Sequence, residues 1–250
     1  MVHFVRSIND IEGKEVAPGV AERILIPPNE TASKICTLKH LVIRPGCKYG
    51  PVQRGESESL VYCISGHGNL SHRGVSDYWT FYEFAGDKFS LIPPVRDFYI
   101  LNCGEDSLRA IHVSYRLTEV SRASVELLSK DNPPRVEMFC KDKAPRIDMV
   151  PGFIARILLP PEVIEDKGIR RFLTLEHITG NPHNKNTFRP PSDTEIIAYF
   201  IRASGRAILG EDEYDLGAGT AVYTGPQHVT RVLDNTGDDV MIWLEIVGRA

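Results

Sequence analysis

The sequence predicts an all-β protein made of two related modules in tandem. The six residues 23–28 return almost unchanged as residues 156–161, and each copy follows a Pro-Gly pair by five residues. From residue 23 to residue 156 the offset is 133. A register that persists along the chain while loops change length indicates a duplicated unit. The same offset relates Ala85, Gly86, Pro93, Asn102 and Gly104 to Ala218, Gly219, Pro226, Asn235 and Gly237.

Within each module the apolar residues come in short runs that end at Gly, Pro, Asn or Asp, which is typical of strands. The clearest runs are residues 60–64 and 196–201, each followed by a Ser-Gly turn signal. They are rich in β-branched and aromatic side chains, which favour strands. Further strands are expected at residues 88–92, 97–101, 220–223 and 239–246.

One stretch, residues 119–130, has apolar side chains at helical spacing and predicts a helix. It is followed by a Pro-, Lys- and Asp-rich stretch where a linker is expected. We therefore predict an N-terminal barrel with an arm and helix at 1–125, a linker at 126–147 and a C-terminal barrel at 148–250.

Composition narrows the class of protein. The 250 residues are 42% hydrophobic and 25% charged, with a net charge of -4, so the chain offers no basic excess to a nucleic acid. The start lacks the features of a signal peptide, and no apolar run approaches the ~20 residues that span a bilayer. We expect a cytoplasmic protein with neither nucleic acid nor membrane as partner. The five cysteines are far apart and form no CxxC pair, so we expect them to be unpaired.

The glycine, proline and asparagine spacing resembles the two motifs of the cupin family, G-x5-HxH-x4-E-x6-G and G-x5-PxGxxH-x3-N. The resemblance covers roughly residues 15–118 and 148–248. It implies two tandem cupin-type double-stranded β-helix (jelly-roll) barrels, a bicupin. The first module matches at Gly46, Val52, Arg54, Ser59, Gly66, Gly86, Pro93 and Asn102, with one extra residue before the proline; the second matches at Gly180, Gly205, Gly219, Pro226 and Asn235, with extra residues in its first motif.

The family binds a metal through the two histidines and the glutamate of the first motif and the histidine of the second. In the first module these positions hold Val52, Arg54, Ser59 and Phe98. Valine and phenylalanine cannot coordinate a metal, and arginine stays protonated and repels a cation. We expect no metal and no other cofactor in this barrel.

In the second module the motif positions fall near Asn186 and Phe188, Arg231 replaces the second-motif histidine, and Glu195 is the single retained ligand type. An alternative is an unorthodox Zn, Mn or Fe site rebuilt from displaced residues, because imidazole and carboxylate suit these metals. That set would be His183, Glu195, His228 and Tyr223.

Among bicupins, residues 55–66 are similar to the metal-free first barrel of the ureidoglycine aminohydrolase group. The manganese ligands of that group, which lie in its second barrel, are the residues missing here. The resemblance therefore implies an architecture and not a reaction, since function depends on the site.

Without a metal, the second barrel is predicted to bind a small anionic metabolite, and transformation of that metabolite is a further expectation. Arg231, Arg189 and Tyr223 are the expected substrate-binding residues, because guanidinium groups pair well with carboxylates and phosphates. His228 and Glu195 are the expected catalytic residues, as proton carriers whose pKa burial can bring towards neutrality.

Two alternatives remain open at this point. The second barrel is a non-catalytic ligand-binding or structural module if Arg231 pairs with a nearby acid such as Glu195 or Asp193. The protein is a metal-dependent hydrolase or dioxygenase if the displaced ligands converge. Exposed sheet edges favour pairing between chains, so a homodimer is a further expectation.

Overall fold

The computed structural model describes residues 3–52, 57–73, 78–94, 96–117, 136–166, 169, 171–226 and 230–250. Strands dominate this part of the chain, which also contains the short helix α2 (Pro161–Asp166) and two 3-10 turns. The strands form two barrels, each made of a seven-stranded and a four-stranded sheet. The predicted all-β class is confirmed, whereas the helix expected at 119–130 lies outside the described residues.

In the first barrel the large sheet has the order β12 (Met138–Cys140), β9 (Lys88–Ile92), β6 (Ser57–Ser65), β11 (Leu108–Arg116), β4 (Cys36–Ile43), β3 (Val20–Ile26) and β2 (Lys14–Ala17). The small sheet has the order β5 (Lys48–Val52), β10 (Asp97–Asn102), β7 (His67–Arg73) and β8 (Trp79–Ala85).

The second barrel repeats this plan. Its large sheet has the order β1 (His3–Ser7), β20 (Thr220–Thr224), β17 (Thr194–Arg202), β22 (Met241–Arg249), β15 (Phe172–Gly180), β14 (Phe153–Leu159) and β13 (Arg146–Val150). Its small sheet has the order β16 (Lys185–Phe188), β21 (Arg231–Asp234), β18 (Ser204–Leu209) and β19 (Asp212–Gly217).

Each large sheet carries one edge strand from outside its own repeat. The N-terminal strand β1 pairs with β20 of the second barrel, and β12 pairs with β9 of the first. Strand β1 comes from the predicted N-terminal segment 1–125, and β12 comes from the predicted linker 126–147. The domain boundaries stay a prediction. Residues 138–140 of β12 lie 133 residues after residues 5–7 of β1, so these strands are equivalent in the two repeats, and each joins the barrel of the other repeat.

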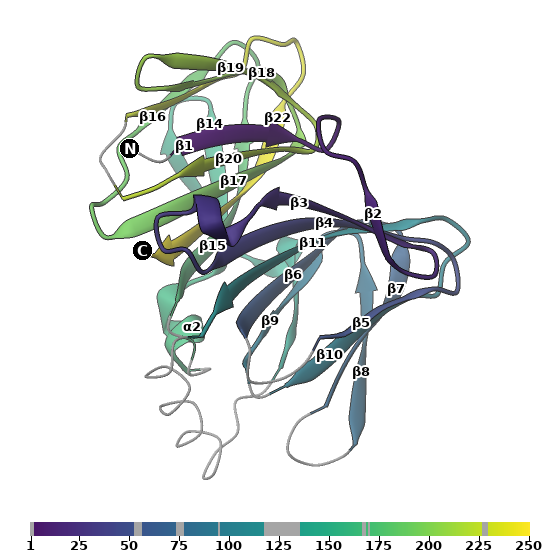
Figure 1. Ribbon diagram of the computed structural model, residues 1–250. Coiled ribbons are helices and arrows are strands. Elements are labelled where there is room, and N and C mark those ends of the chain that lie inside the picture. The colour runs from purple at the N-terminus through teal and green to yellow at the C-terminus, as the bar shows by residue number, and fades with distance from the viewer. Residues whose placement is uncertain are drawn as a thin grey trace.

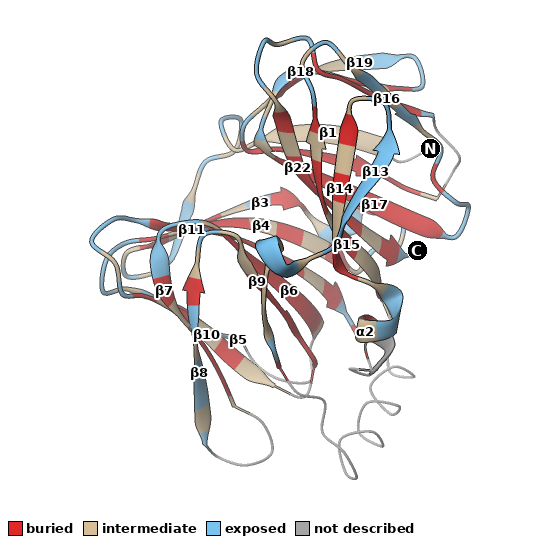
Figure 2. Cartoon of the chain, turned by 180° about the vertical axis from the view of Figure 1, so that it is seen from behind, coloured by how far each residue is buried: buried red, intermediate tan, exposed pale blue. Residues whose placement is uncertain are grey.

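The two large sheets face each other across the middle of the molecule, and the small sheets lie on the outside (Figure 1). Side chains alternate between the faces of a strand. On β17, Ala198 and Phe200 point into the second barrel, while Ile197 and Tyr199 point towards the first. Figure 2 shows the buried residues concentrated on these facing sheets.

The interior of each barrel is filled with apolar side chains. Burying one such side chain stabilises the fold by about 1.5–3 kcal/mol. The first interior includes Leu41, Ile43, Val61, Leu70, Phe84, Phe98 and Ile100; the second includes Phe153, Ala198, Phe200, Leu209, Val222, Met241 and Trp243.

The exposed edges carry few further features. Strand β13 is exposed along its whole length at the edge of the second barrel (Figure 2). A homodimer through such an edge stays a prediction.

All five cysteines lie in the described part of the chain and are free, as expected. Within that part, no helix has the length and apolar character needed to cross a bilayer.

Candidate functional site

The second barrel contains a buried ion pair between Arg231 and Glu245. Arg231 begins β21, where it replaces the second-motif histidine, and Glu245 lies on β22 of the opposite sheet. Arg231 Nη2 donates to Glu245 Oε2 at 2.5 Å, and Trp243 Nε1 donates to the same oxygen at 3.2 Å. The side chains are only 2% and 8% exposed. The arginine thus has an internal partner, although not Glu195 or Asp193.

The guanidinium of Arg231 is incompletely satisfied. Its Nε and Nη1 are buried and have no hydrogen-bond partner among the described residues. The ring of Phe188 lies 5.5 Å from the guanidinium carbon, and Phe188 pairs with Arg231 between β16 and β21. Glu176 is a second acid near this centre, and burial and then the charge of Glu245 raise its pKa. The centre therefore contains two free donors and two acids.

The first barrel holds a histidine where the second has Glu245. His112 and Glu245 are separated by the repeat offset of 133. His112 is hydrogen-bonded through Nδ1 to Tyr49 Oη and through Nε2 to Ser59 Oγ, each at 3.0 Å. The ring of Phe98 packs edge-on against it, with ring centroids 5.4 Å apart. Both nitrogens are thus occupied, and burial lowers the pKa of His112 to about 3.

The residues at the family's metal positions do not fit a metal in either barrel. In the first, Val52 pairs with Phe98, and Ser59 is bound to His112. In the second, Phe188 pairs with Arg231. None of these apolar, hydroxyl or guanidinium groups is a usual ligand for the family's metals. A search of the described residues finds no group of three His, Cys, Asp or Glu side chains that could hold an ion.

Glu195 and Tyr223 lie together on the face of the second large sheet that points towards the first barrel, whereas Arg231 lies inside the second barrel. Glu195 is 0% exposed and accepts hydrogen bonds from Tyr223 Oη at 2.7 Å and from Ser33 Oγ of the first barrel at 2.9 Å. Tyr223 Oη also accepts from the backbone N–H of Ala32 at 2.7 Å. The pair therefore joins the two barrels and does not reach the barrel interior.

The motif spacing and the observed strand pairing differ by one residue in β17, and this difference explains why Glu195 points away from the barrel interior. Ile196, next to Glu195, is the residue of β17 that corresponds to Ser59 of β6, because each pairs with the last residue of the neighbouring strand, Thr224 of β20 and Ile92 of β9. Shifting a strand by one residue moves its side chains to the other face. Glu195 corresponds instead to Glu58, whose Oε2 accepts from the backbone N–H of Arg171 in the second barrel at 2.9 Å.

Removing the Tyr223 hydroxyl should destabilise the contact between the barrels. Tyr223→Phe leaves the Ala32 N–H without its acceptor and removes one of the two hydrogen-bond donors to Glu195, so we expect a loss of about 1–3 kcal/mol in the free energy of unfolding. Urea denaturation measures this loss. Tyr199→Phe is the matched control, because no hydrogen bond to its hydroxyl exists within the described chain. Equal losses in both variants would contradict the assigned role of Tyr223.

The other predicted site residues do not gather at Arg231. Arg189 is exposed, one residue beyond the end of β16. His183 is exposed and pairs with Asp238 at 3.3 Å, whereas Glu195 is fully buried. These two members of the displaced metal set therefore do not converge. His228 lies outside the described residues. Sequence reasoning missed Glu245, although a charged residue inside the apolar run 239–246 was a usable signal.

Comparisons with known proteins identify the fold. No protein-family model matches the sequence, and no curated protein matches it either. Among solved structures, the chain is similar to a putative glyoxylate-induced protein from Pseudomonas aeruginosa, with a TM-score of 0.76, 12% identity and coverage of 99% of this chain and 89% of that one.

Two further solved structures agree. Protein Ylba from E. coli has a TM-score of 0.74 and 13% identity, over 99% of this chain and 90% of that one. A mutant of oxalate decarboxylase OxdC from Bacillus subtilis has a TM-score of 0.72 and 14% identity, over 97% and 76%. At these identities the likeness concerns the fold. The chain therefore has the cupin fold in its two-barrel form, as the motif spacing predicted.

Proposed function

We propose that the protein binds a small carboxylate at Arg231 in the second barrel without the help of a metal. The observation that carries the proposal is the state of Arg231, which is 2% exposed while its Nε and Nη1 have no partner in the described chain. A buried donor without a partner costs about 1–3 kcal/mol. Carboxylate oxygens would satisfy both donors through charge-assisted hydrogen bonds.

Charge and space limit this ligand to a small monoanion or a compact dianion. Glu245 already balances one positive charge, and Glu176, whose pKa is raised by burial and then by the charge of Glu245, is a second acid nearby that disfavours further negative charge. The interior is filled by large side chains such as Phe153, Phe200 and Trp243. The names of two solved structures with this fold refer to glyoxylate and oxalate, which supports acids of two carbons as the first class to test.

Binding rather than catalysis is the function we propose. Glu195, one expected proton carrier, is fully buried between the barrels and bonded to Tyr223 and Ser33. The role of His228 stays a prediction, since that residue lies outside the described chain. A cytoplasmic location and the lack of nucleic-acid and membrane partners also stay predictions.

A purely structural second barrel is the rival function, and a specific observation favours it. The second interior is packed with buried apolar side chains, which leaves little room beside the ion pair. In that case water would satisfy Arg231, and no acid would bind. The same experiment separates the two proposals.

Isothermal titration calorimetry with acetate, glyoxylate and oxalate tests the proposal. We expect at least one acid to bind the wild type and to lose about tenfold or more in affinity to Arg231→Met/Glu245→Met, which removes the donors together with their buried counter-charge. The control is Arg206→Met/Glu213→Met, an exposed pair at 2.6 Å whose removal changes charge equally.

Two outcomes would count against the proposal. If the wild type binds none of the three acids, the structural barrel is the better description. If the Arg231→Met/Glu245→Met variant binds as tightly as the control, the acid binds elsewhere.

A further inference from the structure

A groove lies outside both barrel interiors, on the face of the first large sheet that points away from the interior of the first barrel. Its volume is about 480 Å³. It lies where the N-terminal arm leaves β1 of the second barrel and crosses to β2 of the first (Figure 1). The residues that line it include Ile8, Glu15, Arg23, His40, Arg44 and Arg109.

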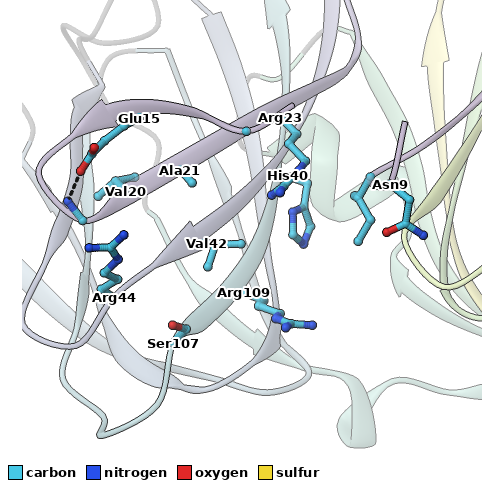
Figure 3. A pocket seen from close by; sticks show the side chains of 13 residues that line it. Asn9, Glu15, Val20, Ala21, Arg23, His40, Val42, Arg44, Ser107 and Arg109 are labelled. Atoms are coloured by element: carbon cyan, nitrogen blue, oxygen red, sulfur yellow. Dashed lines mark hydrogen bonds between the residues drawn. The ribbon is translucent and has the colours of Figure 1, made fainter. Parts of the chain in front are cut away.

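The lining of this groove is strongly positive. Arg23 on β3, Arg44 after β4 and Arg109 on β11 all contribute to it (Figure 3). The guanidinium groups of Arg44 and Arg109 have no hydrogen bond or ion pair with a described residue. Glu15 is the single acid in the lining, and its Oε1 already accepts from the backbone N–H of Gly19 at 2.8 Å. Three arginines therefore face one carboxylate.

A buried histidine forms the floor of the groove, and one of its ring nitrogens has no hydrogen-bond partner among the described residues. His40 is 3% exposed, and no described residue bonds to its buried Nδ1. Its ring stacks on Tyr199 of the second barrel and lies between Arg23 and Arg109 (Figure 3). Burial, then the charges of Arg23 and Arg109, lower the pKa of His40 to about 4. The neutral imidazole can thus form a hydrogen bond that the protein does not supply.

The duplication provides an internal twin of this arrangement, in which the same space is filled. There His177 takes the place of His40, and Arg156 takes the place of Arg23. The twin also holds a carboxylate, that of Asp87, which accepts from Tyr62 Oη at 2.7 Å and from Lys141 Nζ at 2.6 Å. The electrostatic influence of Asp87 and Lys141 extends to His177.

Backbone hydrogen bonds show which residues correspond in the groove. Lys141 N–H donates to Asp87 O at 3.1 Å in the twin, and Ile8 N–H donates to Gly219 O at 3.2 Å in the groove. Asp87 and its lysine therefore correspond to Gly219 and Ile8. At this turn the structural offset is 132, one residue less than the sequence offset that paired Gly86 with Gly219. The turn residues also agree, because Asp87 and Gly219 both have positive φ, at 65° and 83°.

The groove also gains charge relative to its twin. Arg44 N–H donates to Gly19 O at 2.9 Å, and Asn181 N–H makes the equivalent bond to Gly152 O at 2.8 Å, so an asparagine corresponds to Arg44. Arg109 corresponds to an isoleucine at residue 242, since the two are separated by 133. Relative to its twin, the groove lacks the Asp87–Lys141 pair and carries two additional arginines, Arg44 and Arg109.

We propose that this groove binds a compact metabolite with two or more negative charges, whose oxygens take the place that the Asp87 carboxylate holds in the twin. Arg23, Arg44 and Arg109 bind the charged oxygens, as guanidinium groups do for carboxylates and phosphates. A cavity of this volume suits a small molecule larger than a single phosphate ion. The site is separate from Arg231 and goes beyond the function proposed above.

Calorimetry of the full chain with citrate and with inorganic pyrophosphate tests this proposal. We expect the wild type to bind one of them with an affinity that falls as salt is added, because the charges are partly exposed. Arg44→Gln/Arg109→Gln should weaken this binding about tenfold or more. The control is Arg116→Gln/Arg202→Gln, which removes two exposed charges outside the groove, one of them on the same strand as Arg109.

The outcomes separate this site from the second barrel and one ligand class from another. Arg231→Met/Glu245→Met should bind the polyanion as the wild type does, and a preference for citrate or pyrophosphate identifies polycarboxylate or phosphate chemistry. Failure of the wild type to bind either probe would overturn the proposal. Equal weakening in the groove variant and the control would also overturn it, because only overall charge would then matter.

Discussion

Arg231→Met should lower the free energy of unfolding by about 3–5 kcal/mol, because it leaves the buried Glu245 without a counter-charge. Glu245 retains only the Trp243 Nε1 hydrogen bond at 3.2 Å in this variant. Both partners of the ion pair are almost fully buried, so water cannot take over the role of the guanidinium. Urea denaturation at neutral pH measures the loss.

A second substitution should recover most of that stability. In Arg231→Met/Glu245→Met no charge remains buried, and apolar replacements of similar volume often equal or exceed a buried ion pair. Arg206→Met is the exposed control, and it should cost much less stability, because its pair with Glu213 is at the surface and its second partner, Asp234, keeps the ion pair with Lys185. A loss for Arg231→Met no greater than that for Arg206→Met would contradict the assignment of a buried, mutually dependent pair.

Acidification should destabilise the protein steeply between about pH 6.5 and pH 4. Burial lowers the pKa of His40 and His177 to about 4 and that of His112 to about 3. The unfolded chain binds protons at these histidines below about pH 6.5, whereas the folded chain does not, so stability is lost as pH falls. Each histidine costs roughly 2–3 kcal/mol by about pH 4.5. Urea denaturation across this range measures the effect.

Replacing one histidine should remove its share of the pH dependence. His112→Gln loses the hydrogen bonds to Tyr49 and Ser59, so it should be less stable than the wild type at about pH 8. It should nevertheless have a shallower pH slope below about 6.5, because one titrating group is gone. The exposed His67 provides the control, His67→Gln, which should keep the wild-type slope. An unchanged slope in His112→Gln would contradict the prediction.

The fold was more predictable than the site, and the strand register explains why. The repeat and the apolar runs located β6 and β17 and identified the two barrels. The function of a strand residue depends on which face it occupies, and a single added residue reverses that face. The extra residues in the second copy of the first motif obscured this register, so Glu195 was assigned to the barrel interior when it lies between the barrels. Arg231 belongs to the better matched second motif, but its motif position alone did not decide whether the side chain points inward; the structure places it, 2% exposed, beside Glu245 in the second barrel.

Long-range contacts account for the other differences. The role of Glu245 was not predicted, because its partner Arg231 lies on another sheet. The offset of 133 between His112 and Glu245 does show that the two residues occupy equivalent positions in the two repeats. The groove beside Arg23 and Arg109 is lined by strands that are distant in the sequence and by the N-terminal arm. No local pattern predicts which sheet edge that arm will join, because strand pairing is set by tertiary packing.

The exchange of β1 and β12 means that the two repeats of the sequence are not the two folding units of the molecule. Cutting the chain at the repeat boundary would leave each half with an unpaired edge at β9 or β20 and would expose the apolar surface between the large sheets. The covalent link keeps each exchanged strand at high effective concentration near its acceptor, as a tether does in a bivalent complex. The duplicated chain thus behaves as a dimer fused into a single cooperative structure, in which neither half is complete alone.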